Sequence, residues 1–324
     1  MTPLQFEAQY EAEWWELETL LAKLHGFQRR DSAQVAGERL AALYRRACEH
    51  LALARARAYP AYVIDRLDAM TTDAHQLIYQ RKELGFRRLA KLILQDIPRT
   101  VRAHARYVWV ATAVFAIPTL VIGLLVYAQP ELILSVVDPE TAAEFESMYS
   151  PSGEAIGRTR TADTDWAMFG YYIRNNIGVA FQCFAGGIFA GVGSLFFLAF
   201  NGAFAGALGG YLTERGLGST FYSFIVTHAA FELTAIVLSG AAGLRIGHAL
   251  LSPGRATRRQ ALVTAARESI VIIYGVMGLL LIAAAVEAFW SSATWIPNAM
   301  KYSVAAVCWI AVLSYLTLQG RRAG

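Results

Sequence analysis

Residues Phe224 to Ser239 read Phe-Ile-Val-Thr-His-Ala-Ala-Phe-Glu-Leu-Thr-Ala-Ile-Val-Leu-Ser. This run is apolar enough for a membrane-spanning helix, yet it contains two ionisable residues, His228 and Glu232. Their i, i+4 spacing places both side chains on one helix face. An ionisable group at bilayer depth is energetically costly and commonly marks a functional site. We therefore take His228 and Glu232 as the candidate site.

Composition separates a soluble part of the chain from a membrane part. Hydrophobic residues make up 56% of the 324 residues and charged residues 17%, with the charge concentrated in the first third. The remainder contains apolar stretches near the roughly 20 residues that span hydrocarbon. We predict an all-α, polytopic helical membrane protein with about six spans. The expected spans within residues 107–318 are about 107–128, 177–196, 198–213, 221–243, 269–288 and 300–318.

The first part, residues 1–82, is predicted to be a cytoplasmic helical domain. Its helices are expected at about 4–24, 33–58 and 60–82. An apolar stripe on the first helix is formed by Phe6, Tyr10, Trp14 and Leu17. The Trp14-Trp15 pair fits either packing inside this bundle or a surface that docks a partner.

Residues 83–106 are predicted to form a basic amphipathic helix beside the first span. Apolar side chains recur at helical spacing, with basic residues on the other faces. We expect this helix to lie on anionic membrane lipids, the partner that suits basic residues next to a span. The expected lipid-surface residues are Arg87, Arg88, Lys91, Arg99 and Arg102. An ordinary bundle helix is the alternative.

Basic residues between and after the spans predict the topology. The stretch 245–267 and the tail 319–324 carry several arginines, so both are expected on the cytoplasmic side with the N-terminus. Six crossings satisfy this arrangement. The loop 129–174 then lies outside, carries acidic residues and a short helix after Pro139, and is expected to cap the outer mouth or to form a contact surface.

The stretch 177–213 is nearly uncharged and too long for one perpendicular helix. Either two short helices meet near Phe200-Asn201-Gly202, or part of the stretch is re-entrant. Asn175, Asn176 and Asn201 are expected to cap helices or to join the polar site around Glu232. Close helix packing, in a compact bundle or a homo-oligomer, is expected from Gly187, Gly191, Gly202, Gly206, Gly243 and Gly247.

Three interpretations of His228 and Glu232 compete. The pair could be a structural tie inside the bundle, a proton- or ion-linked transport site, or part of a zinc site. The zinc interpretation lacks an obvious third ligand, so we expect no metal. Glu287, near Trp290 at the outer interface, is interpreted as a snorkelling residue.

Other classes of function find no support in the sequence. The three cysteines have no metal-site or disulfide spacing, and no glycine-rich stretch ends like a phosphate loop. The net charge of +4 arises from basic residues beside the spans, so lipid is favoured over nucleic acid. We expect no enzymatic activity, no cofactor and no nucleic-acid partner.

Several motifs resemble the stage II sporulation protein M family of bacterial membrane proteins. They are Asn175-Asn176-Ile-Gly-Val-Ala-Phe, Gly186-Gly187-Ile-Phe-Ala-Gly191, Asn201-Gly202-Ala-Phe-Ala-Gly206, His228-Ala-Ala-Phe-Glu232-Leu-Thr-Ala-Ile and Ala242-Gly243-Leu-Arg245. The family pattern around the histidine is Pro-His-Gly-x-x-Glu-Leu-Pro-Ala. Here Thr227 and Thr234 stand at the proline positions and Ala229 at the glycine, so the residues that would kink the helix are absent.

The resemblance implies assembly rather than catalysis. The sporulation member works in a membrane complex with peptidoglycan-degrading proteins, and related proteins are often encoded beside MoxR-type ATPases. We therefore expect a multi-pass scaffold of the bacterial inner (cytoplasmic) membrane with both termini in the cytoplasm. A cytoplasmic ATPase or cell-envelope proteins are the expected partners. The alternative is a proton- or ion-linked channel or transporter that uses the buried His, Glu and Asn side chains.

Overall fold

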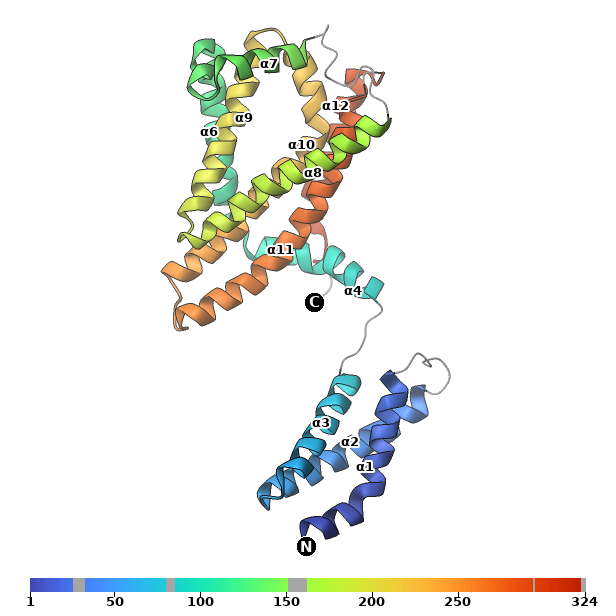
Figure 1. Cartoon of the computed structure of the whole chain (residues 1–324). Helices are drawn as coiled ribbons and strands as arrows, with labels where there is room; N and C mark the ends of the chain where they lie inside the picture. The colour runs from blue at the N-terminus through green and yellow to red at the C-terminus, as the bar shows by residue number, and fades with distance from the viewer. Residues whose placement is uncertain (26–32, 80–84, 151–161, 294, 322–324) are drawn as a thin grey trace. The chain divides into compact units, whose positions relative to one another are not determined.

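The chain is helical and divides into two compact units. The computed structural model describes residues 1–25, 33–79, 85–150, 162–293 and 295–321, and every regular element in these ranges is a helix (Figure 1). The units are Met1–Arg87 and Arg88–Gly324. The all-α prediction is therefore confirmed. The boundary predicted after residue 82 falls outside the described residues.

Three helices form the first unit: α1 (Pro3–His25), α2 (Ala33–Ala56) and α3 (Ala61–Tyr79). Phe6, Trp14 and Leu17 of the predicted stripe are buried in a core shared with α2 and α3. Nε1 of Trp14 donates a hydrogen bond of 3.1 Å to Nδ1 of His50, so the buried indole N–H is satisfied. Trp15 is 66% exposed. The tryptophan pair is thus divided between core and surface.

The second unit is built from long helices. They are α6 (Ala105–Ala128), α8 (Ala162–Ala185), α9 (Val192–Glu214), α10 (Gly218–Leu251), α11 (Arg258–Val286) and α12 (Asn298–Leu318). Among the described residues, five helices are long and apolar enough to cross a membrane: α6, α9, α10, α11 with its extension to Ser291, and α12. The more polar α8 runs diagonally through the unit and packs against α10 and α11 (Figure 1).

The break in the 177–213 stretch lies earlier than predicted. α8 ends at Ala185 and is followed by the short helix η3 (Gly186–Ile188), while α9 runs without interruption through Phe200-Asn201-Gly202. The chain reverses at Gly191, whose φ of +87° suits a residue without a Cβ. Asn201 therefore does not stand at a turn. Its amide donates to the carbonyl of Phe197 in its own helix at 2.7 Å.

The predicted external loop is largely helical. It contains η2 (Pro130–Ser135) and α7 (Pro139–Tyr149), and α8 already begins at Ala162 rather than after Arg174. The short helix expected after Pro139 is confirmed. The carboxylate of Asp138 accepts a hydrogen bond of 2.9 Å from the backbone N–H of Thr141 and so caps α7.

Helix α7 packs over the ends of α9 and α10. The hydroxyl of Tyr211 on α9 donates to Glu146 at 2.5 Å, and Arg215 pairs with the same carboxylate at 3.2 Å. The ring of Tyr149 meets Phe221 of α10 edge-on at 5.1 Å between centroids. We call this end of the unit the cap end.

Glycines bring α6 and α9 into backbone contact. A Cβ added at any of three α9 glycines would overlap a carbonyl oxygen of α6. The facing pairs are Gly202 with Phe115, Gly206 with Thr119, and Gly210 with Gly123. Each helix contributes one residue per turn to this contact, which is the spacing that small-residue packing requires.

A second set of glycines joins the η3 turn to α10. A Cβ at Gly187 would overlap the backbone of Gly243, and one at Gly247 would overlap the backbone of Gly191. All six glycines predicted to pack closely thus lie at close contacts within one chain. These contacts supply no argument for association between copies.

The segment before the first span contains α4 (Gly85–Lys91), the π-helical turn η1 (Leu92–Asp96) and α5 (Ile97–Ala103). Arg87, Arg88 and Lys91 are exposed, as lipid-surface residues would be. Arg99 and Arg102 are placed differently. Arg99 donates to the carbonyl of Gly320 and Arg102 to that of Leu316, both at 2.9 Å. They satisfy free carbonyls at the C-terminal end of α12, where a cation is also favoured by the helix dipole.

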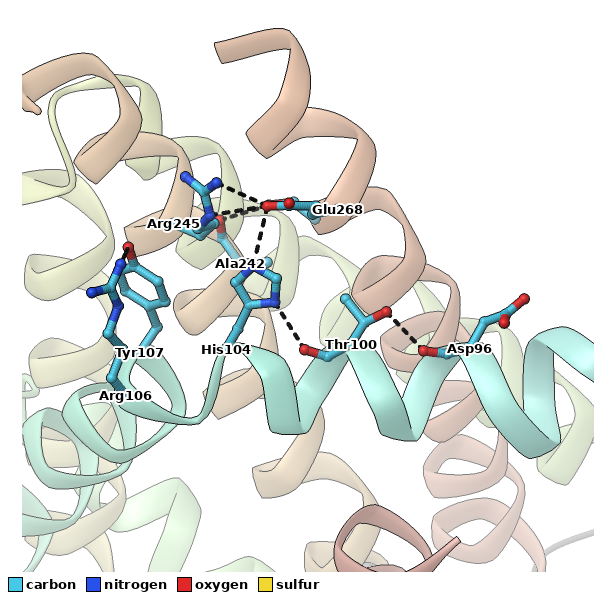
Figure 2. Close-up of polar contacts among 9 residues, drawn as sticks. Asp96, Thr100, His104, Arg106, Tyr107, Ala242, Arg245 and Glu268 are labelled. Atoms are coloured by element: carbon cyan, nitrogen blue, oxygen red, sulfur yellow. Dashed lines mark hydrogen bonds and ion pairs between the residues drawn. The ribbon is translucent and has the colours of Figure 1, made fainter. Parts of the chain in front are cut away.

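Figure 2 shows the polar contacts that fix the junction between α5 and α6. Nε2 of His104 lies 3.1 Å from a carboxylate oxygen of Glu268 on α11, and Nη2 of Arg245 on α10 lies 2.9 Å from the same oxygen. One carboxylate therefore links three helical segments. We call this end of the second unit, where α5, α10, α11 and the end of α12 meet, the basic end.

Candidate functional site

His228 and Glu232 lie on α10, inside the second unit, on one helix face as predicted. His228 is buried, and its Nε2 lies 3.9 Å from a carboxylate oxygen of Glu232. That separation is longer than a hydrogen bond. The close partner of His228 is Ser291, whose Oγ lies 2.9 Å from Nδ1.

Glu287 belongs to the same cluster, which the sequence interpretation missed. One ligand atom from each of His228, Glu232 and Glu287 lies within 4.8 Å of the other two. Glu287 begins the π-helical turn η4 (Glu287–Ser291) that continues α11. This turn delivers both Glu287 and Ser291 to α10, so Glu287 is not a snorkelling residue. Its position within an otherwise apolar stretch was the available signal.

Lys301 ties α12 to the same region. Its side chain is only 5% exposed, and its Nζ donates to the carbonyl of Ser291 at 2.8 Å. The hydroxyl of Thr227 donates in turn to the carbonyl of Lys301 at 3.3 Å. Polar side chains thus connect α10, η4 and α12 deep in the apolar unit, where each buried polar group needs a partner.

Two of the three predicted asparagines lie near the cluster. Nδ2 of Asn175 donates to Oδ1 of Asn176 at 3.1 Å, and both residues lie in the middle of α8 rather than at its start. Asn176 is 2% exposed, and its Nδ2 has no hydrogen-bond partner among the described residues. Asn201 instead bonds to the carbonyl of Phe197 within its own helix.

A cavity of about 680 Å³ brings these groups together. Its polar lining includes His228, Glu232, Glu287, Asn175 and Asn176. The remaining walls are mostly apolar and aromatic and come from α6, α7, α8, α9 and α10. Ligand sites in proteins commonly have about 300–1,000 Å³ and a few convergent polar groups in an apolar wall, so the cavity could accommodate a polar ligand.

The chain matches the family model described as Stage II sporulation protein M over residues 111–292, more than half of its 324 residues. It belongs to the stage II sporulation protein M family. The match contains His228, Glu232, Glu287 and Ser291, whereas Lys301 lies beyond it. The chain is thus a multi-pass membrane member of the stage II sporulation protein M family.

A second family model covers the first unit. Residues 4–80 match a domain of unknown function (DUF8413). This match takes in nearly all of α1, α2 and α3. No curated protein and no solved structure matches the chain. This stage II sporulation protein M family member therefore joins two recognised regions, the helical N-terminal domain and the membrane unit.

Proposed function

We propose that this protein is a non-enzymatic scaffold of the bacterial inner membrane that assembles other proteins around it. One observation carries the proposal: a helical domain with its own buried core is joined to a membrane unit of the stage II sporulation protein M family. A separately folded domain joined to a membrane unit is suited to holding a partner protein beside the membrane.

The proposed orientation places both termini in the cytoplasm. Arg99, Arg102 and Arg245 gather at the basic end, as does the end of α12. Lysine and arginine near span ends are enriched on the cytoplasmic side, so this end would face the cytoplasm. The acidic cap around α7 would then lie outside.

The N-terminal domain offers the surface for a cytoplasmic partner, for which a MoxR-type ATPase is our candidate. Cell-envelope proteins would instead meet the outer cap. On the N-terminal domain, Trp15 is a large apolar side chain at the surface, and exposed tryptophans are frequent anchors of protein interfaces. We further propose that copies of the chain associate through faces other than the glycine contacts described above.

The experiment compares two tryptophan substitutions in the source membranes. Trp15→Ser removes the proposed anchor, and Trp295→Ser removes an 81% exposed tryptophan of the membrane unit as a matched control. After mild cross-linking, the wild-type chain and Trp295→Ser should each retain the same protein near a one-to-one ratio. Trp15→Ser should lose most of it. Equal recovery by all three chains, or no retained protein, would contradict the proposal.

A second candidate function is a proton- or ion-linked transport site, favoured by the cavity that His228, Glu232 and Glu287 share. Its test is flux through proteoliposomes that contain the purified chain. A transporter would pass protons or ions in the wild type and in Glu131→Gln, an exposed control, but not in Glu232→Gln. Equal and negligible flux in all three would reject this candidate.

A further inference from the structure

We propose that His228, Glu232 and Glu287 bind a divalent transition-metal ion inside the membrane unit. The nitrogen and the two carboxylate oxygens lie within 4.8 Å of one another and line the cavity described above. This inference is independent of the scaffold proposal, because a bound ion would be found whether or not a partner protein docks on the N-terminal domain.

The separation of the three atoms is close to that of a coordination sphere. Ligand atoms bound at about 2.0–2.2 Å from one ion lie roughly 3–3.5 Å apart in tetrahedral or octahedral geometry. A separation of 4.8 Å would have to shorten by roughly 1.3–1.8 Å, which is within reach of two glutamate side chains that rotate about several bonds. The three residues come from α10 and η4, so an ion at this point would bridge two segments of the bundle.

The environment of His228 is that of a metal ligand. Histidines that bind metals usually use one ring nitrogen for the ion while the other donates its N–H to a nearby acceptor. Here Nδ1 lies 2.9 Å from Oγ of Ser291, which can accept that N–H. With the proton on Nδ1, the lone pair is on Nε2, which lies 3.9 Å from a carboxylate oxygen of Glu232. Ser291 is thus a positioning residue for the proposed ligand.

Charge also favours an ion at this position. Two carboxylates that share a low-dielectric site repel one another when both are ionised. Lys301 is a cation near this site among the described residues, and its Nζ is engaged with the carbonyl of Ser291 at 2.8 Å. A divalent cation between Glu232 and Glu287 would neutralise both carboxylates where water is scarce.

Asn176 gives an independent indication of a polar ligand. It is 2% exposed, lines the same cavity, and has an amide nitrogen without a hydrogen-bond partner among the described residues. Rotating the amides of Asn175 and Asn176 together by half a turn keeps the bond between them and exchanges donor for acceptor. The amide oxygen of Asn176 would then be available to water carried by the ion.

The donor set narrows the class of ion. Carboxylates suit hard ions such as Mn²⁺, and imidazole suits Zn²⁺ and other transition metals. One imidazole with two carboxylates therefore fits Mn²⁺ or Zn²⁺ better than an alkali cation. Mn²⁺ is the better probe, because it has little affinity for the three cysteines of the chain.

The test is a Mn²⁺ titration of the full chain, purified in mild detergent and stripped with a chelator. Loss of the electron paramagnetic resonance signal of free Mn²⁺ measures binding, and Zn²⁺ is then added as a competitor. The wild type should bind one Mn²⁺ that Zn²⁺ displaces. Loss of one ligand should weaken binding at least about tenfold, since even supporting residues change metal affinity by about 10–100-fold.

Matched variants decide whether the ion sits where we propose. Glu232→Gln and Glu287→Gln should each bind Mn²⁺ at least about tenfold more weakly, whereas the exposed Glu131→Gln should bind like the wild type. Size-exclusion profiles and thermal melting check that each variant is folded. If the wild type binds no Mn²⁺ at millimolar concentration, or if Glu287→Gln binds as tightly as Glu131→Gln, the proposal is overturned. If one carboxylate variant fails to fold, the other still tests the position, and absence of binding in the wild type overturns the proposal by itself.

Discussion

Replacing Gly206 with alanine tests whether backbone contact between α6 and α9 holds the membrane unit together. The added Cβ would overlap the carbonyl oxygen of Thr119 and lie 2.9 Å from its Cα. Because the overlapping atoms belong to the backbone of α6 and cannot rotate away, the two helices must separate. Overpacking of this kind costs about 1–3 kcal/mol. Alanine regains at most about 1 kcal/mol through its higher helix propensity. We expect a net loss of about 1–2 kcal/mol in the free energy of unfolding.

Gly278→Ala on α11 is the matched control, because no described atom outside the local backbone of α11 and the two adjoining residues lies within 4 Å of the added Cβ. Thermal unfolding of the purified full chain in detergent measures both variants. For a unit of this size, about 1 kcal/mol shifts Tm by roughly 2–4 °C. Gly206→Ala should therefore melt about 2–8 °C below the wild type, while Gly278→Ala melts at or slightly above it. If Gly206→Ala melts with or above Gly278→Ala, the close contact is refuted.

Three further predictions follow from single contacts. Ser291→Ala removes the partner of buried His228 and should lower the free energy of unfolding by about 1–3 kcal/mol in a denaturant titration. Ser292→Ala removes only a bond within its own helix, so a loss as large as that of Ser291→Ala would contradict this account. Burial lowers the pKa of His50 below 6.5. The unfolded state therefore takes up the proton first, and the stability of the N-terminal domain should be full above pH 6.5 and fall below it. Thermal melting at pH 7.5 and 5.5 measures this effect as a difference in Tm. If His50→Gln shows the same difference in Tm as the wild type, His50 is not its cause. Arg102→Gln removes the side-chain donor to the carbonyl of Leu316, so the last turn of α12 should fray and its backbone amides should exchange hydrogen faster. Unchanged exchange in this turn would contradict the prediction.

Sequence periodicity and apolar length predicted most helices well, because an apolar stripe or an apolar span can be read from a short stretch of sequence. The helices of the N-terminal domain begin and end within a few residues of expectation, and the short α7 begins at Pro139, close to where it was expected. The spacing of the small residues likewise predicted close packing, although it could not say which helices would meet. Gly206, for example, faces Thr119 of α6.

The position of the chain reversal could not be derived from local preferences. Asn201-Gly202 has the composition of a turn, yet both residues lie within α9. Gly202 faces the backbone of α6, where an added Cβ would overlap the carbonyl oxygen of Phe115. The reversal instead uses Gly191. Both outcomes depend on neighbours that are distant in the sequence, which a local pattern does not contain.

The candidate site was only half predictable for the same reason. His228 and Glu232 are a local pair on one helix, and their spacing identified them. Glu287 reaches them through the π-helical turn η4, and Lys301 of α12 bonds to Ser291, the partner of His228. The bonds of Arg99 and Arg102 to the end of α12 could not be predicted, because a basic residue near a span suits lipid as well as the end of a neighbouring helix.

The most direct test of the scaffold proposal is photo-cross-linking from position 15 in living cells of the source organism. A photoreactive phenylalanine derivative replaces Trp15 in one chain and Trp295 in another, and both are exposed positions. We predict that position 15 forms an adduct with one defined cytoplasmic protein in high yield and that position 295 does not. Adducts with lipid alone, no adduct at position 15, or the same proteins at both positions would contradict the account.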